Sequence, residues 1–312
     1  MTSSDPIPGT AFVALPDLPD NHRAFELLRA NFSDVQVAGA RERALAELSA
    51  LGPEVSAAIV GVKERITADV LDSLPGLRAL GSVGTGRDHL DLAALRDRGV
   101  QVVTTPGVNA VSVAEHAMMM VLALAKQAVA GHGAALSGKD RAGMSAPAVE
   151  IRGRRAGVLG AGATARALLP LLTAFGTDPQ VWTRTPDRHP DLVTRPLEHV
   201  FRRSEILSIH LPLTQETRGL VGRDLLALLP EGALVVNTAR KEIFDLANLA
   251  SAVRDRPDLR FAVDDFELAS DGTATALGER ALLSPHIAGV TVESLGAMQE
   301  SAVRGTIAAL RG

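Results

Sequence analysis

Short apolar runs alternate with longer stretches of helical spacing through the first hundred residues. The apolar runs lie at 10–15, 35–37, 57–62, 77–83 and 100–104, and the stretches of helical spacing lie at 21–31, 40–49, 67–72 and 92–97. Strands that are buried on both faces of a parallel sheet read as continuous apolar runs, and the helices between them supply the crossovers. The pattern therefore predicts a parallel α/β domain.

The same alternation returns after Thr105-Pro106-Gly107, where proline and glycine interrupt regular structure. We expect one long apolar helix over 111–130 and a loop rich in glycine and alanine over 131–145. Further strands are expected at 156–159, 180–182, 206–210, 233–237, 261–263 and 281–284, with helices at 165–174, 246–253 and 291–310. This part of the chain therefore predicts further alternating strands and helices.

The apolar run at 156–159 leads into a glycine turn and a helix. Gly160, Gly162 and Ala165 follow the spacing G-x-G-x-x-A, which is one form of the dinucleotide-binding fingerprint. The first glycine allows a tight turn, the second lets a pyrophosphate come close, and the small third residue lets the helix pack on the strand. Short glycine motifs also recur without a ligand, so a plain Ala/Gly-rich helix start is the alternative at this point.

The composition excludes several kinds of site and binding partner. The chain of 312 residues has a net charge of −4 and no cysteine or tyrosine. No basic field is present to recruit nucleic acid, and disulfides, thiolate metal sites and tyrosine acids are excluded; we expect no metal site. The N-terminus lacks a signal-peptide pattern, and the apolar stretch 117–130 contains Lys126 and is too short to span a bilayer. We therefore expect a cytoplasmic protein that binds neither membrane nor nucleic acid.

Six further motifs follow one another in a fixed order. They are Gly84-Thr85-Gly86-Arg87-Asp88-His89-Leu90-Asp91, Thr105-Pro106-Gly107-Val108-Asn109-Ala110, His210-Leu211-Pro212-Leu213-Thr214, Val236-Asn237-Thr238-Ala239-Arg240, Val263-Asp264-Asp265-Phe266-Glu267 and Ser284-Pro285-His286-Ile287-Ala288-Gly289. From about Leu77 to the C-terminus the chain resembles the D-isomer-specific 2-hydroxyacid dehydrogenases. The first 75 or so residues add only a compatible α/β pattern.

The resemblance implies an α/β fold of two Rossmann-like, doubly wound parallel-sheet domains with the active site in the cleft between them. The substrate (catalytic) domain is expected to be discontinuous, formed by 1–104 and 290–312, and the dinucleotide-binding domain is expected over 105–289. Family members pair through the nucleotide domain, and the long apolar helix offers surface for such a contact, so we expect a homodimer.

The resemblance also implies catalytic roles. Arg240 matches the family arginine that holds the substrate carboxylate and polarises the keto oxygen, and His286 matches the histidine that exchanges a proton with that oxygen. The backbone N–H groups of Val83 and Gly84 match those that help to hold the carboxylate. The chemistry agrees, because reduction of a keto group builds negative charge on its oxygen and a guanidinium and an imidazolium are suitable donors.

The family carries a carboxylate that orients the histidine and raises its pKa. In a gap-free reading this position falls on Ala269, which cannot accept a hydrogen bond. If the loop is two residues shorter, Glu267 takes the role, and Glu267 is the expected third catalytic residue. Asp271, or no carboxylate at all, is the alternative.

The expected nicotinamide cofactor site combines the fingerprint with the ends of later strands. Its residues are Gly160, Gly162, Ala163, Thr164, Thr183, Arg184, Thr185, Leu211, Pro212, Thr217, Thr238, Ala239, Asp264 and Gly289. An NAD enzyme places an acid at the end of the strand after the fingerprint helix, whereas this chain has Arg184 there, which attracts a 2′-phosphate. We therefore expect NADP(H) to be favoured over NAD(H).

Together these observations predict an NAD(P)-dependent oxidoreductase that acts on the CH–OH group of a small 2-hydroxy acid, or reduces the matching 2-keto acid. The alternative is a nucleotide-sensing, corepressor-like binding protein on the same scaffold, with weak or no catalysis. The absence of an unambiguous acid beside His286 favours that alternative, and the presence of both Arg240 and His286 argues against it.

Overall fold

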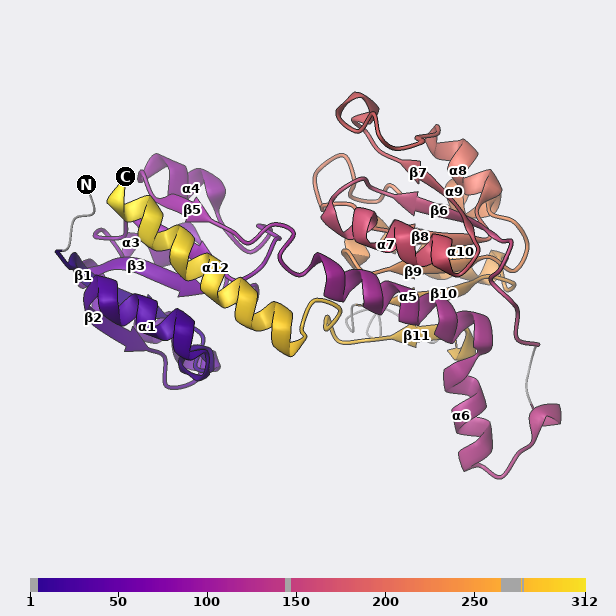
Figure 1. Cartoon of the computed structure of the whole chain (residues 1–312), viewed down its shortest axis with the longest axis horizontal. Coiled ribbons are helices and arrows are strands. Elements are labelled where there is room, and N and C mark those ends of the chain that lie inside the picture. Colours follow the sequence, from indigo (N-terminus) through magenta and orange to yellow (C-terminus); the bar gives the residue numbers. More distant parts are fainter. Residues whose placement is uncertain (1–4, 144–146, 265–275, 277) are drawn as a thin grey trace. The chain divides into compact units, whose positions relative to one another are not determined.

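The computed structural model describes residues 5–143, 147–264, 276 and 278–312. It divides the chain into two compact units, unit 1 with residues 1–109 and 292–312 and unit 2 with residues 110–291. The sequence places its expected boundaries at 104/105 and 289/290, and the assignment of the two units as substrate domain and dinucleotide-binding domain stays a prediction. Each unit is a parallel α/β sheet covered by helices on both faces (Figure 1).

Unit 1 contains a five-stranded sheet in the order β2-β1-β3-β4-β5, and every strand pair is parallel. Its strands are β1 (Ile7–Val13), β2 (Phe32–Val37), β3 (Val55–Val60), β4 (Ala79–Ser82) and β5 (Gln101–Val103). Its helices are α1 (His22–Asn31), α2 (Ala44–Leu51), α3 (Ala68–Asp72), α4 (Leu92–Asp97) and α12 (Val292–Arg311).

Successive residues of β3 show why this sheet is covered on both sides. Ala57 and Ile59 pack into the cluster formed with α1 and α12, whereas Ala58 and Val60 pack into the cluster formed with α2, α3 and α4. Because side chains alternate across a strand, a strand buried on both faces is apolar at nearly every position. That is the pattern by which the sequence indicates a parallel sheet.

Unit 2 contains a six-stranded parallel sheet in the order β11-β10-β9-β8-β6-β7. Its strands are β6 (Arg155–Leu159), β7 (Asp178–Trp182), β8 (Ile206–Ile209), β9 (Leu234–Asn237), β10 (Arg260–Val263) and β11 (Ala281–Leu283). Its helices are α5 (Ala110–Lys126), α6 (Ala128–Leu136), α7 (Ala163–Ala174), α8 (Leu197–Arg203), α9 (Arg223–Leu228) and α10 (Leu246–Asp255).

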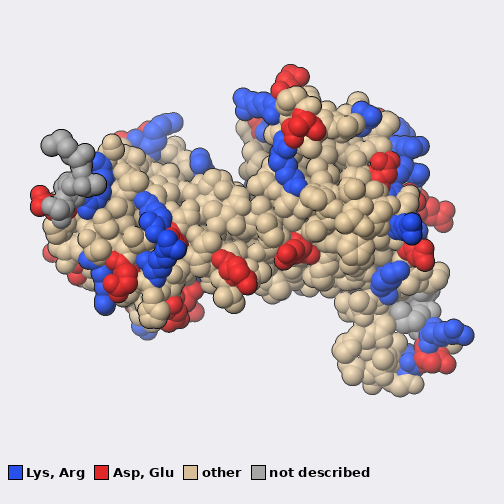
Figure 2. All heavy atoms as spheres, in the orientation of Figure 1, with Lys and Arg blue, Asp and Glu red and all other residues tan. Residues whose placement is uncertain are grey.

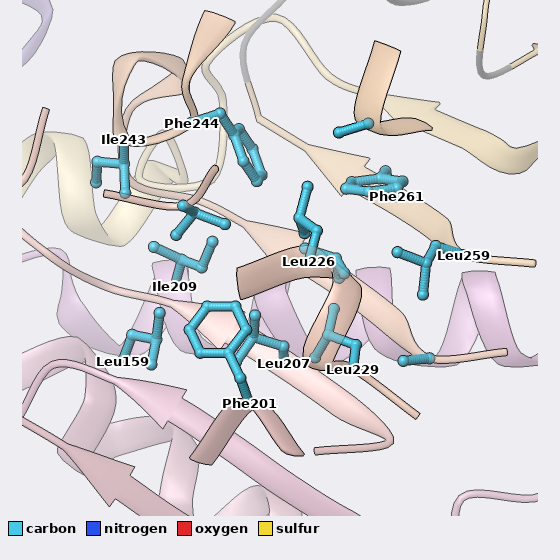
Figure 3. Packing of buried hydrophobic residues seen from close by; sticks show 14 of the residues in the cluster. Leu159, Phe201, Leu207, Ile209, Leu226, Leu229, Ile243, Phe244, Leu259 and Phe261 are labelled. Atoms are coloured by element: carbon cyan, nitrogen blue, oxygen red, sulfur yellow. The ribbon is translucent and has the colours of Figure 1, made fainter. Parts of the chain in front are cut away.

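The two faces of this sheet carry different helices. α5 and α7 pack on one face, against residues such as Ile206 and Val236. α8, α9 and α10 pack on the other face, against Leu207 and Phe261 among others. Figure 3 shows this second cluster, in which the rings of Phe244 and Phe261 meet edge to face with their centroids 6.2 Å apart.

The predicted single helix over 111–130 is wrong. α5 ends at Lys126, and Gln127 takes a left-handed conformation with φ of 52°, so the chain turns by 58° before α6 begins. The predicted loop over 131–145 is also partly wrong, because α6 continues to Leu136. Glycine and alanine were interpreted as loop residues, yet alanine is the strongest helix former.

Among the described residues, no single helix combines the length and the hydropathy that a membrane span requires. α5 and α6 pass that test only when they are taken together across their bend.

Candidate active site

The predicted cofactor residues gather at one edge of the unit 2 sheet. Each group of them directly follows a strand: the glycine turn after β6, 183–185 after β7, 211–217 after β8, 238–240 after β9, Asp264 after β10 and 286–289 after β11. Since all these strands are parallel, their carboxyl ends lie at the same edge. The chain reverses its winding direction between β6 and β8, and such a switch point is where doubly wound sheets bind their ligands.

The glycine turn has the geometry that a dinucleotide requires. Gly160 has φ of 111°, and a Cβ there would lie 2.5 Å from the backbone oxygen of His210, so only glycine fits. Gly162 precedes α7, which begins with Ala163 and Thr164 and has no side-chain cap. A Cβ on Gly162 would meet no atom within 4 Å. The first N–H groups of α7 are thus left for an anion, and the turn fits a pyrophosphate.

Arg184 lies beyond the end of β7, between Thr183 and Thr185. Its Nη1 lies 3.2 Å from Oε2 of Glu216, which belongs to the loop after β8. A hydrogen bond from Thr214, together with the nearby charge of Arg184, holds the pKa of the Glu216 carboxyl below its usual value. The arginine expected to meet a 2′-phosphate is therefore paired with an acid of this chain.

The loop after β8 is held together by Thr217. The buried Thr217 hydroxyl donates to the Pro212 carbonyl at 2.6 Å and accepts from the Thr214 N–H at 2.8 Å. Thr217 therefore shapes the loop that carries Leu211 and Pro212. The predicted role of these three residues in cofactor binding stays a prediction.

Asn237 sets the turn that carries Arg240. This side chain is buried at the end of β9, where its Oδ1 accepts from the Ala239 N–H at 2.9 Å and its Nδ2 donates to the Arg240 carbonyl at 2.8 Å. The two bonds close the segment through Thr238 and Ala239 into a fixed turn. Arg240 follows it half-buried, with Nη1 bonded to the Ala239 carbonyl at 2.9 Å.

His210 begins the motif after β8, although its motif alone predicts no role for it. Its half-buried ring lies between two hydroxyls, with Nε2 2.8 Å from Ser208 Oγ and Nδ1 3.3 Å from Thr238 Oγ1. Burial lowers the pKa of His210 to about 4, so the ring is neutral near pH 7. A neutral ring here keeps a second positive charge away from the turn that carries Arg240.

Asp264 anchors the turn that carries His286. Asp264 is buried, and its Oδ1 accepts from the Ile287 N–H at 2.9 Å while its Oδ2 accepts from the Ala288 N–H at 2.7 Å. Ser284 Oγ donates to the same carboxylate at 2.5 Å. Between these contacts His286 takes a left-handed conformation with φ of 59°, which is uncommon for a residue with a Cβ and is typical of functional turns.

The backbone amides that were expected to hold the substrate carboxylate lie in unit 1. In unit 1 the Val83 N–H donates to the Val60 carbonyl at 2.8 Å, and the Gly84 N–H donates to the Ser82 carbonyl at 3.0 Å. Both amides thus have acceptors within the unit, and their part in holding a carboxylate stays a prediction. Glu267 and its alternative Asp271 lie outside the described residues.

Comparison with known proteins decides the family. The model of the D-isomer specific 2-hydroxyacid dehydrogenase NAD binding domain matches residues 118–288, which is more than half of the chain. The chain belongs to this family. Its relatives include the glyoxylate reductase of Aeropyrum pernix, 33% identical over 83% of this chain and 81% of the relative. The (S)-sulfolactate dehydrogenase of Chromohalobacter salexigens is 32% identical over 80% of this chain and 82% of the relative.

A solved structure agrees over both units of the fold. The crystal structure of the TT0316 protein from Thermus thermophilus matches with a TM-score of 0.83 at 29% identity, and the match covers 97% of each chain. This 2-hydroxyacid dehydrogenase is therefore an NAD(P)-dependent oxidoreductase that acts on a small 2-hydroxy or 2-keto acid. The comparisons give no support to the corepressor-like alternative.

Proposed function

We propose that this dehydrogenase works mainly as a 2-keto acid reductase in which Arg240 binds the substrate carboxylate and His286 donates the proton. The observation that carries the proposal is the placement of both side chains on turns that buried polar residues fix at the sheet edge of the glycine turn. When bound, the reduced nicotinamide supplies the hydride to the keto carbon. The fixed turns hold the two donors ready for the charge that develops on the keto oxygen.

Arg240 and His286 have separate tasks in this account. The planar guanidinium of Arg240 offers a carboxylate two parallel hydrogen bonds, and it also polarises the keto oxygen. The His286 imidazolium gives its proton to that oxygen, which becomes the hydroxyl of the product. Glu267 is the proposed carboxylate partner that keeps His286 protonated.

The proposed preference for NADP(H) rests on Arg184. A guanidinium at this position attracts the two negative charges of a 2′-phosphate, and no acid lies between β7 and Arg184 to take the ribose hydroxyls. Glu216 competes for the same guanidinium. We therefore expect the preference for NADPH to be moderate, with NADH also accepted.

The proposed homodimer rests on α6 rather than on α5. α5 buries eight residues within its own unit, whereas α6 buries none, and Leu136 and Val129 are 77% and 57% exposed. The surface over α6 in Figure 2 carries few charges. A nine-residue helix with two glycines is unstable alone in water, so a second copy of the chain is its proposed partner.

Turnover with a panel of 2-keto acids tests the function. The purified protein is mixed with NADPH or NADH and with glyoxylate, pyruvate, hydroxypyruvate or 3-sulfopyruvate, and cofactor oxidation is followed. We expect oxidation with at least one acid and, where the product is chiral, a D-hydroxy acid. Tight NADPH binding without turnover of any acid would instead support the binding-protein alternative.

The proposed cytoplasmic location is checked separately by cell fractionation.

A further inference from the structure

One face of α5 contacts the segment that carries His286 at two points. Ser112 Oγ lies 3.0 Å from Thr291 Oγ1, and His116 Nε2 lies 3.1 Å from Ser284 Oγ. Residues four apart on a helix share a face, so these two side chains contact the segment on either side of His286. Ser112, His116, Ser284 and Thr291 all belong to unit 2.

The direction of the hydrogen bonds in this network follows from chemistry. An aspartate accepts and does not donate, so the single hydroxyl proton of Ser284 goes to Asp264 Oδ1. The Ser284 oxygen must then accept from His116, which fixes the proton of His116 on Nε2. The chain of donors therefore runs from His116 through Ser284 to Asp264, and Asp264 holds the N–H groups of Ile287 and Ala288.

We propose that His116 is a positioning residue for His286, an inference that rests on the proposed role of His286 as proton donor. The left-handed conformation of His286 is unfavourable by itself and needs its surroundings to hold it. Asp264 can hold this conformation only while its carboxylate accepts from the N–H groups of Ile287 and Ala288. The bond that Ser284 donates fixes that orientation, and the bond from His116 fixes the Ser284 hydroxyl.

Two substitutions of His116 distinguish the effect of its N–H donor from the effect of its ring size. His116→Gln keeps an N–H donor at a similar distance from the backbone, whereas His116→Phe keeps a ring without a donor. We expect His116→Phe to lower kcat for keto acid reduction about tenfold or more, with KM and the melting temperature nearly unchanged. His116→Gln should recover most of the loss. His199→Phe, at an exposed histidine on α8, is the matched control and should behave like wild type.

A second readout does not depend on activity. Hydrogen exchange of the Ile287 and Ala288 amides reports whether Asp264 still holds them. His116→Phe should speed their exchange, and His116→Gln should restore the protection. In a Ser284→Ala background His116→Phe should add no further effect, because the Ser284 hydroxyl that joins His116 to Asp264 is already absent.

These readouts also separate this inference from the proposed function. If wild type reduces no keto acid, the proposed function fails, whereas the exchange experiment still tests the link between His116 and the turn. Wild-type exchange and wild-type kcat in His116→Phe would overturn the inference. Equal damage from Gln and Phe would also overturn it, because the donor would then not be what matters.

Discussion

Asn237 and Asp264 act on the site through the backbone rather than through substrate. Asn237 is 1% exposed and Asp264 is 4% exposed, and each uses its side chain to bond the turn that follows its own or a neighbouring strand. A buried polar group that loses such partners is costly, so each side chain and its turn stabilise one another. Arg240 and His286 consequently leave the sheet edge from backbones that have little freedom.

Exchanging the charge at position 184 should reverse the cofactor preference. In wild type we expect NADPH to bind more tightly than NADH, and Arg184→Asp should invert that order, because aspartate repels a 2′-phosphate and accepts from ribose hydroxyls. Dissociation constants from cofactor fluorescence check this. Equal constants for both cofactors in wild type would remove the basis of the prediction.

Glu216 competes with a 2′-phosphate for Arg184, so its removal should strengthen the preference for NADPH over NADH. Glu216→Gln frees the guanidinium from an exposed ion pair, and such pairs are weak because solvent screens them. We expect NADPH to bind up to about fivefold more tightly and NADH binding to change little. Glu198→Gln, which breaks the exposed pair with Arg202 on α8, is the control. An equal gain for both cofactors would contradict the account.

Replacing the proposed partner of His286 should move the pH profile. A nearby carboxylate stabilises imidazolium and raises its pKa, so Glu267→Gln should lower that pKa. His286 then loses its proton earlier as pH rises, and the alkaline limb of keto acid reduction moves to lower pH. Cofactor affinity should stay nearly unchanged. A profile identical to wild type would leave the role to Asp271 or to no carboxylate.

Sequence motifs located the residues at the strand ends but not their connections. Arg240, Asp264 and His286 stand in motifs that can be read locally. The contact between His116 and Ser284 joins residues 168 positions apart, and the pairing of Arg184 with Glu216 joins the ends of two strands. Such contacts depend on the order of strands in the sheet, which spacing along the chain does not reveal.

At the scale of elements, continuous apolar runs predicted the strands well. Every expected strand is present, and most bounds agree within two residues, since burial on both faces leaves a clear apolar signal. α8 and α9 were not predicted. The equally short α3 and α4 follow the capping residues Thr67 and Asp91, whereas α8 and α9 begin without a side-chain cap, so no helix start is marked in their sequence. α6 was missed because it has no buried face to give it an amphipathic pattern.

An ion pair between Arg256 and Asp258, in the segment that joins α10 to β10, should make the free energy of unfolding depend on pH. Arg256 donates two hydrogen bonds to Asp258, at 2.8 and 2.7 Å, and also bonds the Leu226 carbonyl at the end of α9. Arg256 lowers the pKa of Asp258 to about 2. A carboxyl whose pKa is lowered by folding stabilises the fold above its unfolded pKa near 3.8, and this stabilisation is lost as pH falls towards 2.

Asp258→Asn should therefore lower the free energy of unfolding at pH 7 by about 1 kcal/mol, because solvent screens part of this interaction. The difference from wild type should shrink as pH falls from about 4 to about 2. Urea unfolding at both ends of that range measures it. Asp255→Asn, which breaks the exposed pair with Arg223, is the control and should cost much less. A pH-independent difference for Asp258→Asn would contradict the assignment.

At the scale of the whole molecule, the state of association tests the proposed role of α6. Light scattering at micromolar concentration should give the mass of a dimer for wild type. Leu136→Asp places a charge on the proposed interface and should shift the mass towards the monomer. Val193→Asp, at an apolar residue that is 63% exposed in unit 2, should remain a dimer. A monomeric wild type would refute the proposal.

Arg240 should matter for both binding and rate. If its guanidinium contacts the substrate carboxylate in the ground state and the developing oxyanion in the transition state, as proposed, Arg240→Ala should raise KM and lower kcat together. A change confined to KM would mean that Arg240 only binds the substrate.

The proton-donor role of His286 is tested by the rate of keto acid reduction by His286→Ala at saturating NADPH. We expect a rate about 10²- to 10⁴-fold below wild type, because the proton donor is gone, with the dissociation constant of NADPH unchanged. A His286→Ala enzyme that reduces the acid at the wild-type rate would contradict the assignment of His286 as the proton donor.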